Sequence, residues 1–196
     1  MYDFFYSKLL PRCGENNIDL GFTDTDSFCF QVKNADIFDS KMNEFMDYSN
    51  YPKEHHLFNE NNKAALGYFK DELEGKSECL EFVGLRSKCY AMNIKSLKTG
   101  ELSDKKICKG LGSVAIKKRL KFKQYKNCLL KGKTYRHHYT SIVSQKQNVF
   151  TVIRKKKALS NFDSKRYIYM CGKHSSPFGS SLIDKYKGKC YKCKLF

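Results

Sequence analysis

Two aspartates separated by one residue, Asp24 and Asp26, give this sequence its clearest potential for chemistry. They lie in Phe22-Thr23-Asp24-Thr25-Asp26-Ser27, and the flanking residues alternate between apolar and other types, with Ile18, Leu20 and Phe22 before the pair and Phe28, Phe30 and Val32 after it. This alternation predicts two strands joined by a tight acidic connection over residues 17–33. Because like charges repel and burial penalises ions, such a pair favours a divalent cation. Mg²⁺ typically takes one or two carboxylates together with substrate phosphates.

Two other interpretations of the acidic segment stay open at this point. Asp and Ser are common turn residues, so the segment is also compatible with an ordinary turn between strands. A metal-binding Asp-x-Asp pair would also suit a nucleotide-sugar transferase. The choice depends on the rest of the chain.

A second group of residues has the types and spacing of a metal site. Cys171-x-x-His174 and Cys190-x-x-Cys193 are separated by 15 residues, and both pairs have the spacing of zinc ligands. The N-terminus has no signal-peptide pattern, so we expect an intracellular chain. The nine cysteines, odd in number and scattered, then predict free thiols rather than a disulfide framework. A non-catalytic, basic DNA-binding protein with a Zn²⁺ site is therefore one interpretation of the whole chain.

The charge of the chain is concentrated in its second half. Residues 1–100 carry 12 Lys and Arg against 16 Asp and Glu, whereas residues 101–196 carry 25 against 4. This excess predicts a surface for a polyanion in the second half. Tyr and Phe interleaved with the lysines favour nucleic acid over a membrane. No apolar run is long enough to span a bilayer, so no membrane partner is expected.

The elements that would position these residues alternate between helices and strands. We expect a helix over residues 1–9 that ends at Pro11, and a second helix over residues 35–48 that packs over a sheet through Phe38, Met42, Phe45 and Met46. Residues 50–64 are predicted to be a polar loop, and residues 66–109 several strands with a hairpin turn at 98–101. Further along we expect two short basic helices, over Ser113–Leu120 and Phe122–Leu130. A strand pair is predicted over residues 139–157, and a partly disordered tail over residues 172–196.

Taken in order, several segments resemble motifs of the family B DNA polymerases. Phe22–Ser27 resembles the Tyr-Gly/Thr-Asp-Thr-Asp-Ser palm motif, with Phe22 keeping the ring but not the hydroxyl of the usual Tyr. Leu85–Tyr90 is similar to the Lys-x-Tyr element that follows it, and Lys105–Gly110 to the Lys-rich segment that leads into the thumb. Leu159–Tyr167 resembles the C-terminal region of the protein-primed branch, which viruses and self-synthesising DNA transposons carry. Met1–Tyr6 is similar to the helix before the palm motif in that branch.

The resemblance implies an α+β fold and a role for each matched position. Residues 1–110 would be the C-terminal part of a palm, an antiparallel sheet with an acidic hairpin, and residues 111–196 a basic thumb and tail. Asp24 would bind the catalytic Mg²⁺ pair, and Asp26 would act as an outer ligand or an orienting group. The residues implied in nucleotide or primer binding are Thr25, Ser27, Lys88 and Tyr90. Those implied in contacts with the DNA backbone are Lys105, Lys106, Lys109, Lys165 and Arg166.

The implied activity is nucleotidyl transfer by a DNA-directed DNA polymerase. Its partners would be primer–template DNA, deoxynucleoside triphosphates and a terminal priming protein, in a nuclear or virus-associated setting. The sequence lacks the family's Asp-x-x-Ser-Leu-Tyr-Pro carboxylate motif, its fingers lysine and its exonuclease domain. We therefore expect a C-terminal fragment that is inactive alone and needs a missing N-terminal polymerase segment.

Overall fold

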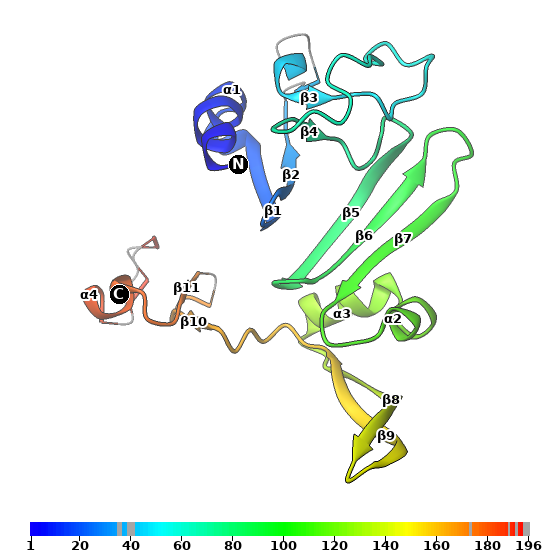
Figure 1. Cartoon of the computed structure of the whole chain (residues 1–196). Helices are drawn as coiled ribbons and strands as arrows, with labels where there is room; N and C mark the ends of the chain where they lie inside the picture. The colour runs from blue at the N-terminus through cyan, green and yellow to red at the C-terminus, as the bar shows by residue number, and fades with distance from the viewer. Residues whose placement is uncertain (35–36, 39–41, 173, 188, 191, 194–196) are drawn as a thin grey trace.

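The computed structural model describes the 196-residue chain except residues 35–36, 39–41, 173, 188, 191 and 194–196. Helices and small sheets alternate along the chain, and all strand pairs but one are antiparallel, so the expected α+β class is confirmed (Figure 1). In the described part of the chain, no helix combines the length and the apolar character needed to cross a membrane.

The N-terminal helix runs through the proline that was expected to end it. A π-helical segment, η1 (Phe4–Leu9), leads directly into α1 (Leu10–Cys13), where Pro11 lies at the start of the new helix. The amide of Leu10 donates to the carbonyl of Phe5, five residues back, so the turn before Pro11 is wider than an α-turn. Proline is tolerated in a first helical turn, where its missing N–H is not needed. The expected stop at Pro11 was therefore wrong, and the helix ends at Gly14, whose φ is +81°.

The predicted acidic hairpin is present. After a short 3-10 turn, η2 (Glu15–Asn17), strand β1 (Ile18–Asp24) pairs antiparallel with β2 (Ser27–Val32), and Asp24 lies opposite Ser27. The N-terminal helix packs against this hairpin in a first core, built around Phe4, Leu9, Ile18 and the aromatic rings of Phe28 and Phe69.

The segment expected as a helix over residues 35–48 is different where the structure describes it. It contains a 3-10 turn, η3 (Met42–Glu44), and strand β3 (Met46–Asp47), which pairs in parallel with β4 (Phe69–Lys70). The extended course is held by the buried Asp47 carboxylate, which accepts hydrogen bonds from the amides of Ser49 and Ala64 and pairs with Lys70 at 3.0 Å. Met42 and Met46 are buried in the first core, so the helix was wrong although the apolar packing was right.

The central sheet has the order β5–β6–β7, from Ser77–Arg86, Cys89–Ser96 and Leu102–Cys108. Its β6–β7 turn lies where the sequence predicted one, with φ of +73° at Gly100. Helices α2 (Ser113–Arg119) and α3 (Phe122–Lys131) follow, as expected from the sequence. A second core joins the sheet to these helices across residue 110, through Val83, Leu85, Cys89, Ala91, Cys108, Leu120, Phe122, Tyr125, Cys128, Ala158 and Leu159.

Two further parts complete the chain. Strands β8 (Tyr135–Gln145) and β9 (Asn148–Leu159) form a long two-stranded ribbon that extends away from the helices (Figure 1). An extended segment then leads to a small C-terminal hairpin of β10 (Arg166–Ile168) and β11 (Ser175–Pro177), followed by α4 (Ser181–Lys185). Residues 172–196, expected to be partly disordered, thus contain a strand and a helix.

Candidate functional site: acidic hairpin, basic ribbon and Cys/His cluster

The turn of the acidic hairpin is tight and holds its carboxylates at the end of two strands. Thr25 has a left-handed φ of +57°, and the amide of Asp26 donates to the carbonyl of Asp24 at 2.7 Å. The Ser27 hydroxyl donates to the same carbonyl at 3.1 Å. The backbone conformation of Thr25 and the hydrogen bond of the Ser27 hydroxyl to a backbone carbonyl therefore shape the turn. The Asp24 side chain remains half-exposed.

Asp24 forms an ion pair with Lys88, which lies 64 residues further along the chain. Lys88 belongs to the two-residue turn between β5 and β6, where its φ is +54°. The lysine and aspartate side chains are 44% and 38% exposed. Ion pairs at such exposed positions contribute about 0–1 kcal/mol, so this pair is weak enough to be exchanged for another cation or anion.

A stack of aromatic rings lies next to this ion pair and joins the hairpin to the central sheet. Phe22 stacks on Tyr90 with ring centroids 4.4 Å apart, and Phe82 lies 6.0 Å from Phe22. Gly21 permits this approach, because a Cβ there would lie 3.2 Å from the Phe82 ring. Burial, followed by the charges of Cys29 and Asp24, raises the pKa of Tyr90. The ring at Phe22 keeps the stacking surface that a Tyr would supply.

The five lysine and arginine residues expected to bind DNA lie in different surroundings. Lys105 pairs with Glu72 at 3.4 Å, and the Lys109 amide donates to the Lys88 carbonyl at 2.9 Å. Lys106 has a side chain only 14% exposed, and its ammonium donates to the Leu120 carbonyl at 2.7 Å. Lys106 thus acts in the fold, capping the end of α2.

Lys165 and Arg166 lie at the start of the C-terminal hairpin. The Arg166 guanidinium donates to the Ser175 hydroxyl at 2.8 Å and to the Ser175 carbonyl at 2.9 Å. These bonds hold β10 to β11. Asp24, Lys88 and Tyr90 are therefore brought together, whereas Arg166 is used within its own hairpin.

The ribbon gathers positive charge at its base. The cross-strand neighbours are Arg136 and Lys157, His137 and Lys156, His138 and Lys155, and Tyr139 and Arg154. Arg136 and Lys157 are like charges that face each other, which is destabilising, and β8 and β9 contain no acidic residue to neutralise them. The Lys156 ammonium lies 4.4 Å from the Tyr139 ring centre, and its hydrogen bond lowers the pKa of that Tyr.

The sequence predicted a basic second half, but it did not predict that the Arg154–Lys157 run lies opposite further basic residues on β8. Arg136 and His138 are exposed and lie on the strand opposite the run. The signal was available in the absence of acidic residues between 135 and 159. Only the pairing register, however, says which basic residues face each other.

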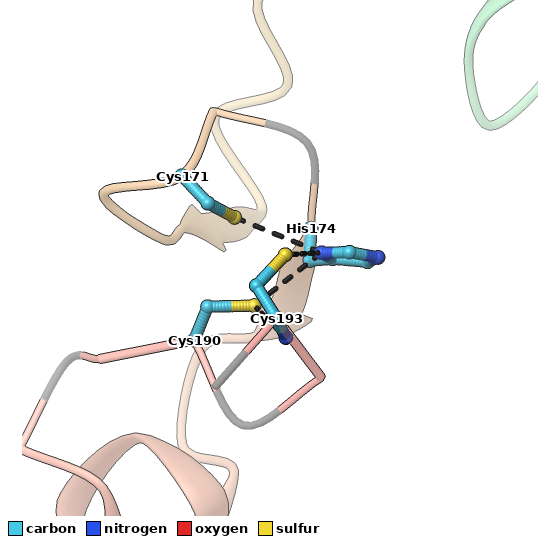
Figure 2. A group of neighbouring side chains, drawn as sticks. All are labelled: Cys171, His174, Cys190 and Cys193. Carbon is cyan, nitrogen blue, oxygen red and sulfur yellow. Dashed lines mark hydrogen bonds between the residues drawn. The ribbon is translucent and has the colours of Figure 1, made fainter. Parts of the chain in front are cut away.

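The motifs Cys171-x-x-His174 and Cys190-x-x-Cys193 come together in one cluster (Figure 2). The donor atoms of Cys171, His174, Cys190 and Cys193 all lie within 4.8 Å of one another. The Nδ1 atom of His174 is 3.7 Å from the Cys171 sulfur, 3.3 Å from the Cys190 sulfur and 3.1 Å from the Cys193 sulfur. Cys171 and His174 come from the connection between β10 and β11, and Cys190 and Cys193 from the chain after α4. This group could hold a metal ion.

The Cys/His cluster brings four possible metal ligands together, whereas the acidic hairpin supplies two. Burial, followed by hydrogen bonds with Cys190 and Cys171, raises the pKa of Cys193 to about 11, so a cation is needed to hold the Cys193 sulfur as a thiolate. Among the residues that the structure describes, no third Asp, Glu, His or Cys joins Asp24 and Asp26 to form a comparable group.

Comparison of the chain with protein-family models, curated proteins and solved structures gives no match.

Proposed function

We propose that this chain is the C-terminal palm and thumb portion of a DNA-directed DNA polymerase of family B, of the protein-primed kind. The proposal is supported by one observation above all. Asp24, Lys88 and Tyr90 come from two separate motifs that the sequence resemblance implicated, and they meet where the acidic hairpin approaches the β5–β6 turn. An ordinary acidic turn gives no reason for this convergence.

Each residue of the convergent group has a role in the proposed reaction. Asp24 offers a half-exposed carboxylate to Mg²⁺, and Asp26 orients the turn or binds an outer-shell water. Lys88 balances the charge of Asp24 until a cation arrives, and then contacts a phosphate of the primer strand. Tyr90 and Phe22 hold the hairpin against the sheet so that both charged groups keep their positions. Two Mg²⁺ ions about 3.5–4 Å apart activate the primer hydroxyl and neutralise the leaving pyrophosphate in such reactions.

The described residues supply only one side of a two-metal site. Misplacement of a reacting group by about 1 Å can already cost 100-fold in rate, and a two-carboxylate turn alone does not hold two ions, a triphosphate and a primer end. We therefore propose that catalysis needs a further polymerase segment that carries the other palm carboxylate and a fingers lysine.

The basic ribbon is the proposed contact with duplex DNA. The repulsion between Arg136 and Lys157 decreases when phosphates lie between or beside them. Contacts of this kind fix the position of the protein on DNA without reading sequence. They also make binding strongly dependent on salt, because each contact releases counterions.

A specific observation favours a second candidate function for the C-terminal part. We propose that the Cys/His cluster binds Zn²⁺, because three sulfurs and one imidazole nitrogen form a typical tetrahedral donor set for that ion. In the alternative interpretation, this site belongs to a non-catalytic DNA-binding protein, and the acidic hairpin is an ordinary turn.

Primer extension separates the two candidates. The purified chain is mixed with a polypeptide carrying the upstream palm and fingers of a protein-primed polymerase, together with Mg²⁺, primer–template and nucleotides. We expect extension in the mixture, loss of extension with Asp24→Asn, and none from the chain alone. Retention of full extension with Asp24→Asn contradicts the polymerase proposal. One Zn²⁺ per chain by metal analysis, lost in Cys190→Ser and kept in the control Cys79→Ser, tests the metal proposal on its own.

A further inference from the structure

The C-terminal module, residues 162–193, has few buried residues of its own. Tyr169, Ser176 and Cys190 are 1%, 3% and 5% exposed, and neither of the two hydrophobic cores includes them. Further contacts include the hydrogen bond of 2.7 Å between the Tyr169 and Ser176 hydroxyls and the edge-on packing of the Tyr167 and Tyr169 rings, with centroids 5.4 Å apart. A unit of this size without a sizeable core usually needs a disulfide or a metal to fold.

The Cys/His cluster is placed to be that staple. It joins the connection between β10 and β11 to the segment after α4, so one ion would tie the β10–β11 hairpin to the C-terminal end of the module (Figure 2). This step rests on the proposed Zn²⁺ site.

The surface of the module is basic and carries exposed rings. Residues 162–193 contain seven Lys and Arg against two Asp. Phe162 and Phe178 are 61% and 60% exposed, and the Lys185 ammonium lies over the Tyr186 ring at 5.7 Å. The exposed basic residues that the structure describes are Lys165, Arg166, Lys185, Lys187, Lys189 and Lys192. Exposed aromatic rings among cations favour a ligand that combines phosphates with flat apolar faces.

Single-stranded nucleic acid is that ligand, because its unpaired bases present their faces to aromatic side chains. Among the residues of the module that the structure describes, no element suits a duplex groove, since α4 has 5 residues and β10 and β11 have 3 each. The basic ribbon, in contrast, has strands of 11 and 12 residues that suit a duplex. We infer that the metal-bound C-terminal module binds single-stranded nucleic acid at a surface distinct from the duplex contact of the ribbon.

Two sets of variants in the full chain test this inference with two probes, a labelled oligo(dT) strand and a labelled hairpin duplex, by fluorescence anisotropy. Phe178→Ala should weaken oligo(dT) binding by roughly 5-fold or more and leave duplex binding unchanged. The double variant Lys155→Gln with Lys157→Gln should weaken duplex binding and leave oligo(dT) binding unchanged. Leu97→Ala, which truncates a side chain 57% exposed in the β6–β7 turn, is the matched control. Equal weakening of both probes by either set of variants overturns the inference.

The metal dependence is tested with His174→Ala and with a chelator. Both should abolish the oligo(dT) contact and leave the duplex contact, while Cys79→Ser changes neither. A chain that holds Zn²⁺ but shows no effect of Phe178→Ala overturns the single-strand site and leaves the metal proposal standing. A chain without Zn²⁺ that still loses oligo(dT) affinity with Phe178→Ala refutes the metal proposal and the metal dependence inferred here.

Discussion

Replacement of Lys88 distinguishes a residue that contacts DNA from one that merely supports the fold. Lys88→Ala removes an ion pair whose two side chains are 44% and 38% exposed. Pairs at such sites contribute about 0–1 kcal/mol to stability. Lys88 also has a left-handed backbone, with φ of +54°, and alanine keeps that strain. We therefore expect Lys88→Ala to lower the free energy of unfolding by less than about 1 kcal/mol.

Lys88→Gly provides a second, independent change at the same position. It removes the same charge but relieves the left-handed backbone, which costs a non-glycine residue about 1–2 kcal/mol. We therefore expect Lys88→Gly to be at least as stable as the native chain. Both variants remove the same ammonium, so they should lose the same DNA affinity while differing in stability.

The effect on DNA can be estimated from the single contact that is lost. In the proposed binding mode, the Lys88 ammonium exchanges Asp24 for a primer phosphate, so the expected net loss is smaller than the roughly 1.5–3 kcal/mol of a hydrogen bond to a charged group. We expect about 5-fold weaker primer–template binding, and a decrease of about 0.9 in the slope of log affinity against log salt.

The assay is an anisotropy titration of labelled primer–template at several salt concentrations, with urea denaturation of the same proteins. Lys98→Ala, in the exposed β6–β7 turn, is the matched control and should change neither slope nor stability. An unchanged salt slope in both Lys88 variants, or a loss of stability above about 2 kcal/mol in Lys88→Gly, would refute the proposed role.

Three further predictions follow from other parts of the structure. In the basic ribbon, Lys155→Gln with Lys157→Gln should lower the duplex salt slope by about 2 with no dependence on DNA sequence, whereas a strong preference for one duplex sequence contradicts a backbone contact. Burial raises the pKa of Asp47, but hydrogen bonds from Ser49, Lys70 and Ala64 outweigh it, so the pKa is lowered overall. The Asp47 carboxylate therefore stabilises the fold above its unfolded pKa of about 3.9, and this stabilisation is lost as the pH falls below that value. Asp47→Asn should therefore destabilise the chain by about 3 kcal/mol at pH 7 and by progressively less in acid, while the exposed Asp19→Asn control changes stability by less than about 1 kcal/mol. Tyr125→Phe removes a buried hydroxyl that donates to the Ile107 carbonyl at 3.1 Å, and should lower the free energy of unfolding by about 1 kcal/mol in urea denaturation, with no change in duplex binding.

Local patterns in the sequence determined most of the elements near the candidate sites. The alternation around Asp24 and Asp26 was enough to predict the hairpin, and the ribbon and the helices α2 and α3 were likewise found from their patterns. These features depend on side chains within one strand or one turn, so the sequence carries the information locally. The spacing within each Cys/His pair likewise predicted four candidate metal ligands, Cys171, His174, Cys190 and Cys193, which the structure brings together.

Local patterns gave the wrong backbone at two places, one through an unusual local turn and one through contacts distant in the sequence. A proline rule predicted a helix end at Pro11, but a wide π-turn accommodates the ring and the helix continues. The apolar spacing of residues 35–48 suggested a helix, but Asp47 binds the nearby Ser49 amide together with the distant Ala64 amide and Lys70, and holds the chain extended. Helical periodicity predicts that apolar side chains share one face of a helix. A buried carboxylate that binds distant partners can nevertheless keep the backbone extended.

Which charged groups meet was decided only by the tertiary structure. The sequence contains many lysines that could neutralise Asp24, and Lys88 does so because the β5–β6 turn is brought next to the hairpin by the stacked rings of Phe22 and Tyr90. Lys106 and Lys109 are near neighbours in the sequence, yet one is turned into the fold and the other is exposed. The closing of two Cys/His pairs into one cluster also depends on how β10, β11 and α4 fold back on each other. Coulomb and coordination energies depend on distances through space, and residue spacing along the chain fixes those distances only within a single element.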